Sequence, residues 1–285
     1  MRWLVTGAGG MLGRDLRARL AEVGATDVVA ASRAELDITD PVAVRAAVDG
    51  ADVVVNAAAW TDVDGAEAAE AAATAVNGHA VQTLAAAAGK RLIHLSTDYV
   101  FNGAGAEPYA EDTPTAPVNA YGRGKAVGEW AVLAAGGYVV RTAWLYGEHG
   151  PNFVRTMLRL AAERDTVAVV DDQQGPPTWS YALAGQVIAL AAAAAAGRAV
   201  PGAYHGTAAG STTWYGLARA VFAEAGLDPD RVRPTTSDRF PRPARRPAYS
   251  VLGHAGWAGT GVASLPDWRT MLAEAMPVLL RADGE

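Results

Sequence analysis

The chain contains no cysteine among its 285 residues. Disulfide bonds, thiolate metal sites and a cysteine nucleophile are therefore excluded, and the absence is compatible with a reducing compartment. Lysine is nearly absent as well, since only Lys90 and Lys125 contribute to the 24 basic side chains. We expect a lysine in such a chain to lie where arginine cannot replace it, for example where a tunable pKa is needed.

Long hydrophobic runs are also missing. The longest apolar stretch, residues 182–196, is interrupted by Gly185 and Gln186 and is too short to span a bilayer, so it predicts a buried helix. The apolar run at the N-terminus ends at Gly7, which is too early for the core of a secretory signal. We therefore expect a soluble, cytoplasmic protein without a membrane partner.

The composition is that of a folded protein with an acidic balance. Hydrophobic residues make up 51% of the chain and charged residues 19%, which excludes disorder as a description of the whole. The formal net charge of -6 argues against a nucleic-acid partner, because such a protein needs a basic face.

Short β-branched runs alternate with alanine-rich helical stretches through the first half of the chain. This alternation predicts an α/β fold, a Rossmann-type doubly wound parallel sheet with helices on both faces. The predicted strands are residues 3–6, 27–30, 52–56, 91–96 and 138–141. The predicted helices are residues 12–23, 41–48, 66–89 and 121–135.

The pattern changes after about residue 147. We expect a dinucleotide-binding Rossmann domain over residues 1–147. Residues 148–285 would form mainly a smaller α/β substrate-binding lobe, with some segments returning to the Rossmann sheet. The helices predicted there are residues 153–164, 181–196 and 214–225, and the strands are residues 167–170 and 202–206. Residues 239–247 carry three prolines and four arginines and predict a loop.

A glycine-rich turn follows the first predicted strand, with the sequence TGAGGMLG at residues 6–13. Gly7, Gly10 and Gly13 are three residues apart, as a tight turn, a close backbone approach to pyrophosphate and a close helix–strand contact require. Met11 and the first turn of the helix that begins at Leu12 would present free N–H groups to the phosphates. A flexible loop is the alternative, but the position at a strand–helix junction favours a dinucleotide.

The end of the second predicted strand indicates the cofactor. Ser32 and Arg33 stand where an acid would bind a ribose hydroxyl, and they suit a 2′-phosphate instead. This favours NADPH over NADH, which stays possible. In the alternative, Arg33 is solvated and Asp37, beside Ile38, contacts the cofactor. The third predicted strand ends in three small residues that leave room for a ligand, namely Ala57, Ala58 and Ala59.

Three residues form a candidate catalytic group. Tyr121 and Lys125 are four apart on a predicted helix and so share one face, where the lysine ammonium should lower the pKa of the phenol. Such a phenol can exchange a proton with a substrate oxygen, and Thr97, at a strand end, can hydrogen-bond that oxygen. The alternative is a surface helix with an incidental pair.

These residues resemble the extended short-chain dehydrogenase/reductases and, within them, the dTDP-4-dehydrorhamnose reductases. The glycine and tyrosine–lysine motifs are common to the superfamily, whereas STDYVF at residues 96–101 and the motifs after it resemble the narrower family. The resemblance covers nearly the full length. It rests on VTG at 5–7, NAAAWT at 56–61, VD at 63–64 with AE at 66–67, STDYVF at 96–101, YG at 121–122 with Lys125, RTAW at 141–144, NF at 152–153, MLRLA at 157–161, DQ at 172–173 and RP at 246–247.

The resemblance implies an activity and roles for residues. Tyr121 would donate the proton, Lys125 would hold the nicotinamide ribose, and Asn77 would hold a water or backbone contact near the lysine. The reaction would be hydride transfer to the C4 ketone of a dTDP-linked 4-keto-6-deoxysugar, as in conversion of dTDP-4-dehydro-L-rhamnose to dTDP-L-rhamnose. The substrate would be bound by Val63, Asp98, Tyr99, Trp144, Asn152 and Arg246, the last as a possible clamp on its diphosphate.

Some features leave alternatives open. Asp15 replaces a glutamate that joins a magnesium-linked dimer in some members, so both Mg²⁺ and the choice between monomer and homodimer are undecided. The five histidines lack ligand spacing and are expected to be structural or exposed.

Two other functions remain in view. One is a nucleotide-sugar epimerase or dehydratase, although the reductase-epimerases of the fucose route use a cysteine that is absent here. The other is a non-catalytic regulatory subunit, like the partner of methionine adenosyltransferase.

Overall fold

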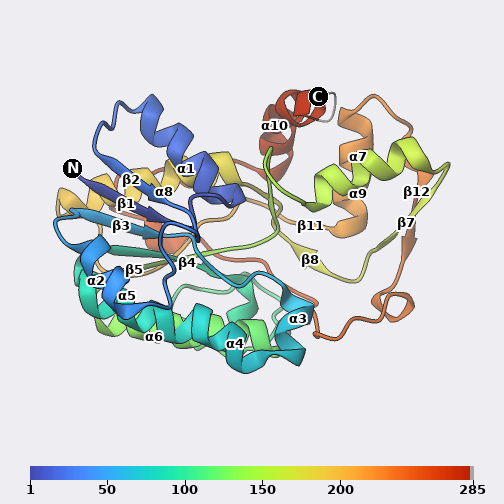
Figure 1. Cartoon of the computed structure of the whole chain (residues 1–285). Helices are drawn as coiled ribbons and strands as arrows, with labels where there is room; N and C mark the ends of the chain where they lie inside the picture. Colours follow the sequence, from blue (N-terminus) through green and yellow to red (C-terminus); the bar gives the residue numbers. More distant parts are fainter. Residues whose placement is uncertain (283–285) are drawn as a thin grey trace.

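The computed structural model describes residues 1–282 and has a six-stranded sheet at its centre (Figure 1). The strand order is β10-β5-β4-β3-β1-β2, and every neighbouring pair is parallel. Its strands are β1 (Trp3–Thr6), β2 (Val28–Ala31), β3 (Val53–Asn56), β4 (Leu92–Thr97), β5 (Tyr138–Thr142) and β10 (Gly202–His205). The predicted α/β class with a doubly wound parallel sheet is confirmed.

The strands form where the sequence is richest in β-branched residues. Every residue of β1, β3, β4 and β5 is buried, because helices cover the sheet on both faces. β2 lies at an edge and is half-buried. Each strand of this sheet lies within one residue of its predicted range.

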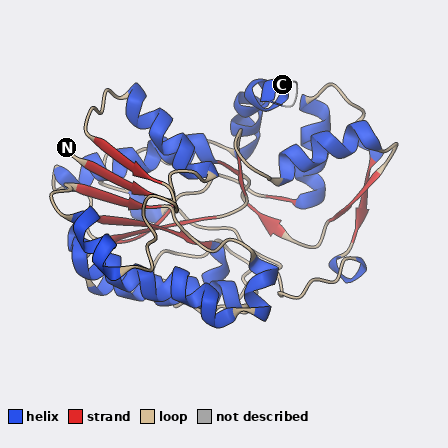
Figure 2. Cartoon of the chain, in the orientation of Figure 1, coloured by secondary structure: helices blue, strands red, loops and turns tan. Residues whose placement is uncertain are grey.

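Helices flank the sheet on two sides (Figures 1 and 2). On one side α1 (Met11–Glu22) packs against α8 (Ser180–Ala195). On the other lie α2 (Pro41–Val48), α5 (Ala80–Ala88) and α6 (Ala120–Ala134). In residues 1–282, no helix is both long and apolar enough to cross a membrane.

The rest of the second half forms a smaller cluster beside the sheet (Figure 1). Its helices are α7 (Phe153–Glu163), α9 (Trp214–Glu224) and α10 (Trp268–Ala282), and its strand pairs are β12–β7, β11–β8 and β6–β9. These strands are β6 (Leu145–Tyr146), β7 (Val167–Val170), β8 (Gln174–Gly175), β9 (Thr178–Trp179), β11 (Thr212–Thr213) and β12 (Val232–Thr235). β10 and α8 lie with the central sheet instead. The division into two domains stays a proposal.

The helix predicted over residues 66–89 is wrong in its detail. The segment is divided into α3 (Val63–Ala68), α4 (Glu70–Thr74), a π-helix (Ala75–His79) and α5, because Ala69 leaves the helical conformation with φ -135° and ψ 43°. The remaining short helices are 3₁₀ turns at Gly89–Arg91, Asp98–Val100, Pro229–Arg231, Ser237–Arg239 and Ala255–Trp257.

Glycines bring α6 close to the π-helix. A Cβ atom on Gly128 would lie 2.4 Å from the Asn77 carbonyl oxygen, and one on Gly78 would lie 2.9 Å from Val127 Cγ1. Side chains at these positions would push the two helices apart. This close contact fixes the helix that carries Tyr121 and Lys125.

Candidate active site

A cavity of about 1140 Å³ lies at the carboxyl ends of β1, β3, β4 and β5, the edge where open α/β sheets bind ligands. The smaller cluster contributes further lining through the segment before α7 and through α9. Eighteen of the predicted site residues line it: Gly7, Gly10, Met11, Leu12, Gly13, Arg33, Asp37, Ile38, Ala57, Ala58, Ala59, Val63, Thr97, Asp98, Tyr99, Tyr121, Lys125 and Trp144.

The glycine turn is as tight as its spacing predicts. Gly7 has φ +68°, and a Cβ atom there would lie 2.5 Å from the backbone nitrogen of Ala58. A Cβ atom on Gly13 would lie 2.2 Å from the Gly7 carbonyl oxygen. The turn therefore needs glycine for both its conformation and its packing.

The first turn of α1 has no capping side chain. Gly10 occupies the N-cap position, so the first backbone N–H groups are free to meet an anion. By contrast, Asp40, Asn119 and Asn152 cap α2, α6 and α7 with their side chains. The uncapped, glycine-lined end at the cavity fits a pyrophosphate.

The end of β2 lies at one end of the cavity. Arg33 is exposed there and lines the cavity together with Asp37. The Asp37 carboxylate accepts hydrogen bonds from the backbone and hydroxyl of Thr39, which hold the pKa of Asp37 below its usual value. Arg33 places a cation at this end of the cavity. Ser32 lies outside the lining, where its N–H donates to Glu35 Oε2.

Thr97, Asp98 and Tyr121 come together beside the end of β4. The Thr97 hydroxyl donates to Asp98 Oδ1 over 3.0 Å and accepts the Tyr99 N–H over 3.2 Å. The Tyr99 and Tyr121 rings meet edge to face, with centroids 5.9 Å apart. Burial raises the pKa of Asp98 to about 6, and its hydrogen bond with Thr97 opposes that rise.

The expectation that Lys125 lowers the pKa of Tyr121 is wrong for this state of the protein. Burial raises the pKa of Tyr121, and the nearby carboxylate of Asp98 adds to the rise. The Thr97 hydroxyl opposes it. The phenol is therefore held in its protonated form.

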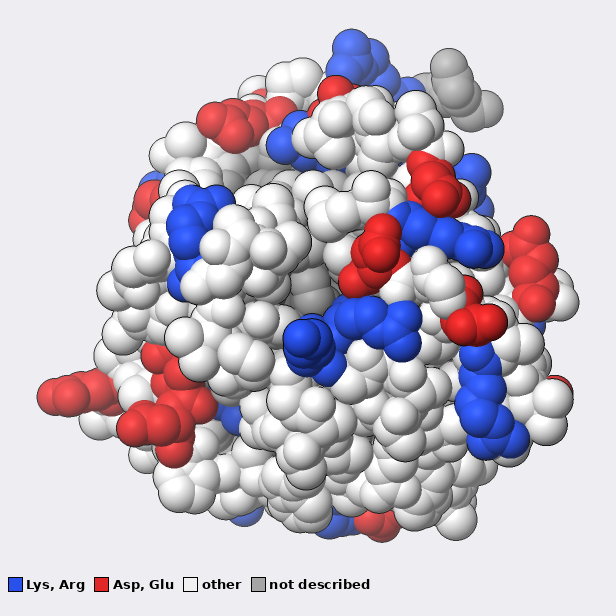
Figure 3. Space-filling model, turned by 90° about the vertical axis from the view of Figure 1, so that its left-hand side faces the viewer, with Lys and Arg blue, Asp and Glu red and all other residues white. Residues whose placement is uncertain are grey.

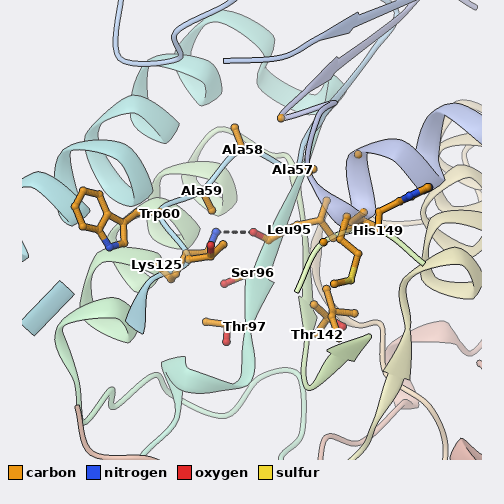
Figure 4. A pocket seen from close by; sticks show the side chains of 18 of the residues that line it. Ala57, Ala58, Ala59, Trp60, Leu95, Ser96, Thr97, Lys125, Thr142 and His149 are labelled. Carbon is orange, nitrogen blue, oxygen red and sulfur yellow. Dashed lines mark hydrogen bonds between the residues drawn. The ribbon is translucent and has the colours of Figure 1, made fainter. Parts of the chain in front are cut away.

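Lys125 lies with its amine against β4. Nζ donates to the Leu95 carbonyl oxygen over 2.6 Å, as Figure 4 shows, and lies 3.1 Å from His94 Nε2. Burial lowers the pKa of Lys125 to about 8, while Glu129 on the same helix acts in the opposite direction. The tyrosine–lysine spacing predicted that the two residues share a helix face, but it did not indicate the contacts of Nζ with Leu95 and His94.

Two tryptophans form an apolar wall. Trp144 has a left-handed backbone, with φ 50°, and stacks on Trp214 with centroids 3.6 Å apart and planes 6° from parallel. A non-glycine residue in this conformation is strained, and strain of this kind gathers at functional sites. Trp144, in the turn after β5, lines the cavity together with Trp214.

Two predicted substrate residues lie outside the lining. Arg246 makes a two-pronged ion pair with Asp64, with Nη1–Oδ1 2.7 Å and Nη2–Oδ2 3.0 Å, so a diphosphate would have to displace that carboxylate. Asn152 caps α7 by accepting the Arg155 N–H, and it donates to the Gly147 carbonyl oxygen. Their roles toward substrate stay predictions.

Comparison with known proteins places the chain in a family. Residues 1–280 match the family described as the RmlD substrate binding domain. The chain belongs to this RmlD family. The resemblance inferred from the sequence motifs is thereby confirmed.

Relatives within the RmlD family carry names of nucleotide-sugar reductases. The dTDP-4-dehydrorhamnose reductase of Streptomyces griseus is 54% identical over 99% of this chain and 95% of its own. The dTDP-4-keto-6-deoxy-D-glucose reductase of Streptomyces niveus is 52% identical over 99% of this chain and 98% of its own. The crystal structure of dTDP-4-dehydrorhamnose reductase from Bacillus anthracis in complex with NADP superposes with a TM-score of 0.90 at 34% identity. The match covers 97% of this chain and 98% of that chain.

Several lining residues of this RmlD-family chain were not predicted as site residues from sequence patterns. Trp60, Thr142, His149 and Trp214 all contribute to the cavity lining, and the structure brings them from four separate segments (Figure 4 labels the first three). Trp214 and Trp144 are far apart in the sequence, and only tertiary packing brings their rings into contact. Asn77 does hold a backbone contact, since its amide pairs with both the N–H and the carbonyl of Trp60.

Asp15, the residue that left the binding of Mg²⁺ undecided, is buried. Its Oδ2 accepts a hydrogen bond from Ser180 Oγ over 2.5 Å, and His149 Nε2 lies 4.0 Å from Oδ1. Over residues 1–282, no group of three or more histidine, cysteine, aspartate or glutamate side chains could hold a metal ion.

On the face drawn in Figure 3, basic and acidic side chains lie close together around a hollow.

Proposed function

We propose that this protein reduces the C4 ketone of a dTDP-linked 4-keto-6-deoxysugar with NADPH, converting dTDP-4-dehydro-L-rhamnose to dTDP-L-rhamnose. The proposal rests above all on one observation: a single cavity joins an uncapped glycine turn to Thr97, Tyr121 and Lys125. The printed names of the relatives and the NADP in the Bacillus anthracis structure support it.

The residues present fit a nicotinamide dinucleotide. The tight turn that Gly7 and Gly13 allow leads into the uncapped end of α1, whose free N–H groups would meet the pyrophosphate, and Arg33 would pair with the 2′-phosphate. Lys125 would hold the nicotinamide ribose. When bound, the nicotinamide supplies the hydride.

Tyr121 would give its proton to the C4 oxygen as the hydride arrives at C4. The raised pKa of Tyr121 keeps the phenol protonated at neutral pH, which is the form that a reduction needs at its start. Thr97 would turn its hydroxyl from Asp98 toward the same oxygen and stabilise its developing charge. Proton transfer to that oxygen leaves an alcohol on the sugar and a phenolate on Tyr121.

The cavity suits a 6-deoxysugar. The stacked Trp144 and Trp214 present an apolar wall that a C5 methyl group can contact, and Val63 adds to the apolar lining. The buried carboxyl of Asp98 can hydrogen-bond a sugar hydroxyl near the reacting carbon.

The decisive experiment supplies dTDP-4-dehydro-6-deoxyglucose and NADPH, with and without a 3,5-epimerase, and follows the absorbance of NADPH. We expect oxidation that depends on the epimerase. Oxidation without it would indicate a dTDP-4-keto-6-deoxy-D-glucose reductase, the activity named for the Streptomyces niveus relative. If neither mixture oxidises NADPH, the catalytic proposal is wrong and a regulatory subunit becomes the better account.

A further inference from the structure

A chain of buried polar side chains runs behind the site from β1 to α6. Thr6 Oγ1 donates to Asn56 Oδ1 over 2.5 Å, and Asn56 Nδ2 lies 2.9 Å from His94 Nδ1. His94 Nε2 lies 3.1 Å from Lys125 Nζ. All four residues are at most 2% exposed, so their hydrogen-bonding groups must satisfy one another.

The backbone fixes the orientation of the Asn56 amide. The Ala58 N–H can only donate, and it points at Asn56 Oδ1 over 3.2 Å. The atom at that place must therefore be the amide oxygen, because an NH₂ group would oppose the N–H. The Asn56 NH₂ group consequently faces His94.

This orientation determines the tautomer of His94. Nδ1 must accept the hydrogen bond from Asn56 Nδ2, so Nδ1 carries no proton. A doubly protonated imidazolium would point Nδ1–H at the Asn56 NH₂ group and is excluded. His94 is therefore neutral and carries its proton on Nε2, which faces Lys125.

The His94 proton in turn constrains Lys125. An ammonium group has three donors and no acceptor, so it cannot accept a hydrogen bond from His94 Nε2–H. A neutral amine can accept that proton with its lone pair while it donates to the Leu95 carbonyl oxygen, the second contact of Nζ. Only the neutral amine satisfies both contacts.

We propose that His94 is a positioning residue that favours the neutral amine form of Lys125 in the cofactor-free protein, by donating Nε2–H to Nζ. The other groups around Lys125 either favour its neutral form or have their charge paired elsewhere. Burial lowers the pKa of Lys125, and the carboxylate of Glu129, which acts against this, is paired with Arg141 over 2.8 Å. Tyr121, one turn away on α6, is a protonated phenol.

The consequence for turnover rests on the proposed reductase activity. A neutral amine stabilises a phenolate on Tyr121 less than an ammonium does, so the neutral form of Lys125 helps the phenol to keep its proton until the substrate oxygen accepts it. Once the O–H bond of Tyr121 has broken, water must return a proton to the phenolate. Protonation of Lys125 would stabilise the phenolate that proton transfer leaves on Tyr121.

The two-lysine composition allows a direct test. Protein labelled with ¹³C,¹⁵N-lysine gives ε-methylene and Nζ signals from only Lys90, which is exposed, and Lys125. A Lys90→Arg variant assigns the two signals. In cofactor-free protein we expect Lys125 to titrate near pH 8, well below the usual pKa of a lysine. Ring ¹⁵N shifts of His94 should report the Nε2–H form throughout.

Variants separate this effect from general destabilisation. In His94→Gln the amide oxygen can accept a hydrogen bond from an ammonium, so the Lys125 midpoint should rise by about one pH unit or more. His205→Gln is the matched control: His205 is equally buried but bonds Gly253 and Arg141, and the Lys125 midpoint should not move.

Two results would overturn the proposal: an ordinary midpoint for Lys125 in the wild type, or an Nδ1–H tautomer for His94. The titration needs no substrate. A protein that titrates as expected but oxidises no NADPH would therefore contradict the proposed function and leave the role of His94 intact.

Discussion

Asp98→Asn should make the protein more stable at neutral pH while it impairs the site. Asp98 is 4% exposed, and burial raises its pKa from 3.8 to about 6. Asparagine has nearly the same shape, keeps an oxygen to accept the Thr97 hydroxyl bond, and carries no charge. The substitution thus removes the cost of ionising a buried carboxyl.

The magnitude follows from the difference between folded and unfolded pKa values. Each pKa unit corresponds to about 1.4 kcal/mol, so ionised Asp98 costs about 3 kcal/mol of folding free energy. The free energy of unfolding of the wild type falls as the pH rises between the two pKa values, because the folded state binds more protons there than the unfolded state does. The cost is therefore absent below about pH 4, grows as the pH rises, and is complete above about pH 7.

Urea unfolding followed by tryptophan fluorescence measures this difference. The variant should exceed the wild type by about 3 kcal/mol near pH 8 and by almost nothing near pH 4. Asp112→Asn, at an exposed site, is the matched control and should show no such pH-dependent gain. The reasoning fails if Asp98→Asn gives the same difference from the wild type at both pH values.

Three further substitutions test other parts of the structure. Arg141→Met leaves the fully buried carboxylate of Glu129 unpaired and should cost about 3–5 kcal/mol in urea unfolding, much of which Glu129→Leu in the same chain should restore. Arg33→Ala should weaken NADPH binding about 10- to 100-fold in fluorescence titrations with little change for NADH; an equal loss for both would remove Arg33 from the 2′-phosphate. Gly13→Ala should weaken both cofactors about tenfold or more, because its Cβ atom would lie 2.2 Å from the Gly7 carbonyl oxygen, and unchanged affinity would contradict the tight turn.

The sheet and its glycine turn could be predicted because local sequence determines them. Apolar β-branched runs mark the buried strands, and only glycine tolerates the backbone at Gly7 and the packing at Gly13. The missed break at Ala69 and the π-helix lie in an alanine-rich stretch whose propensity favours an ordinary helix throughout. There, packing against α6 overrides local preference.

The chemistry of the site was less accessible from the sequence. Spacing on one helix placed Tyr121 and Lys125 together, but both pKa shifts depend on burial, and that of Tyr121 depends also on Asp98, which follows β4. The stacking of Trp214 on Trp144 likewise depends on the smaller cluster meeting the sheet. Such contacts between distant segments have no periodic signature in the sequence.

Tyr121→Phe tests the central claim most directly, because it removes one oxygen and leaves the ring in place. Turnover is measured as NADPH oxidation with the dTDP-4-keto-6-deoxysugar, and cofactor affinity by fluorescence titration of the same protein. Tyr109→Phe, outside the cavity lining, is the control for loss of a phenol oxygen. We expect turnover of Tyr121→Phe to fall by about 10²- to 10⁴-fold while NADPH affinity stays within about twofold. Turnover equal to that of the wild type would contradict Tyr121 as the proton donor.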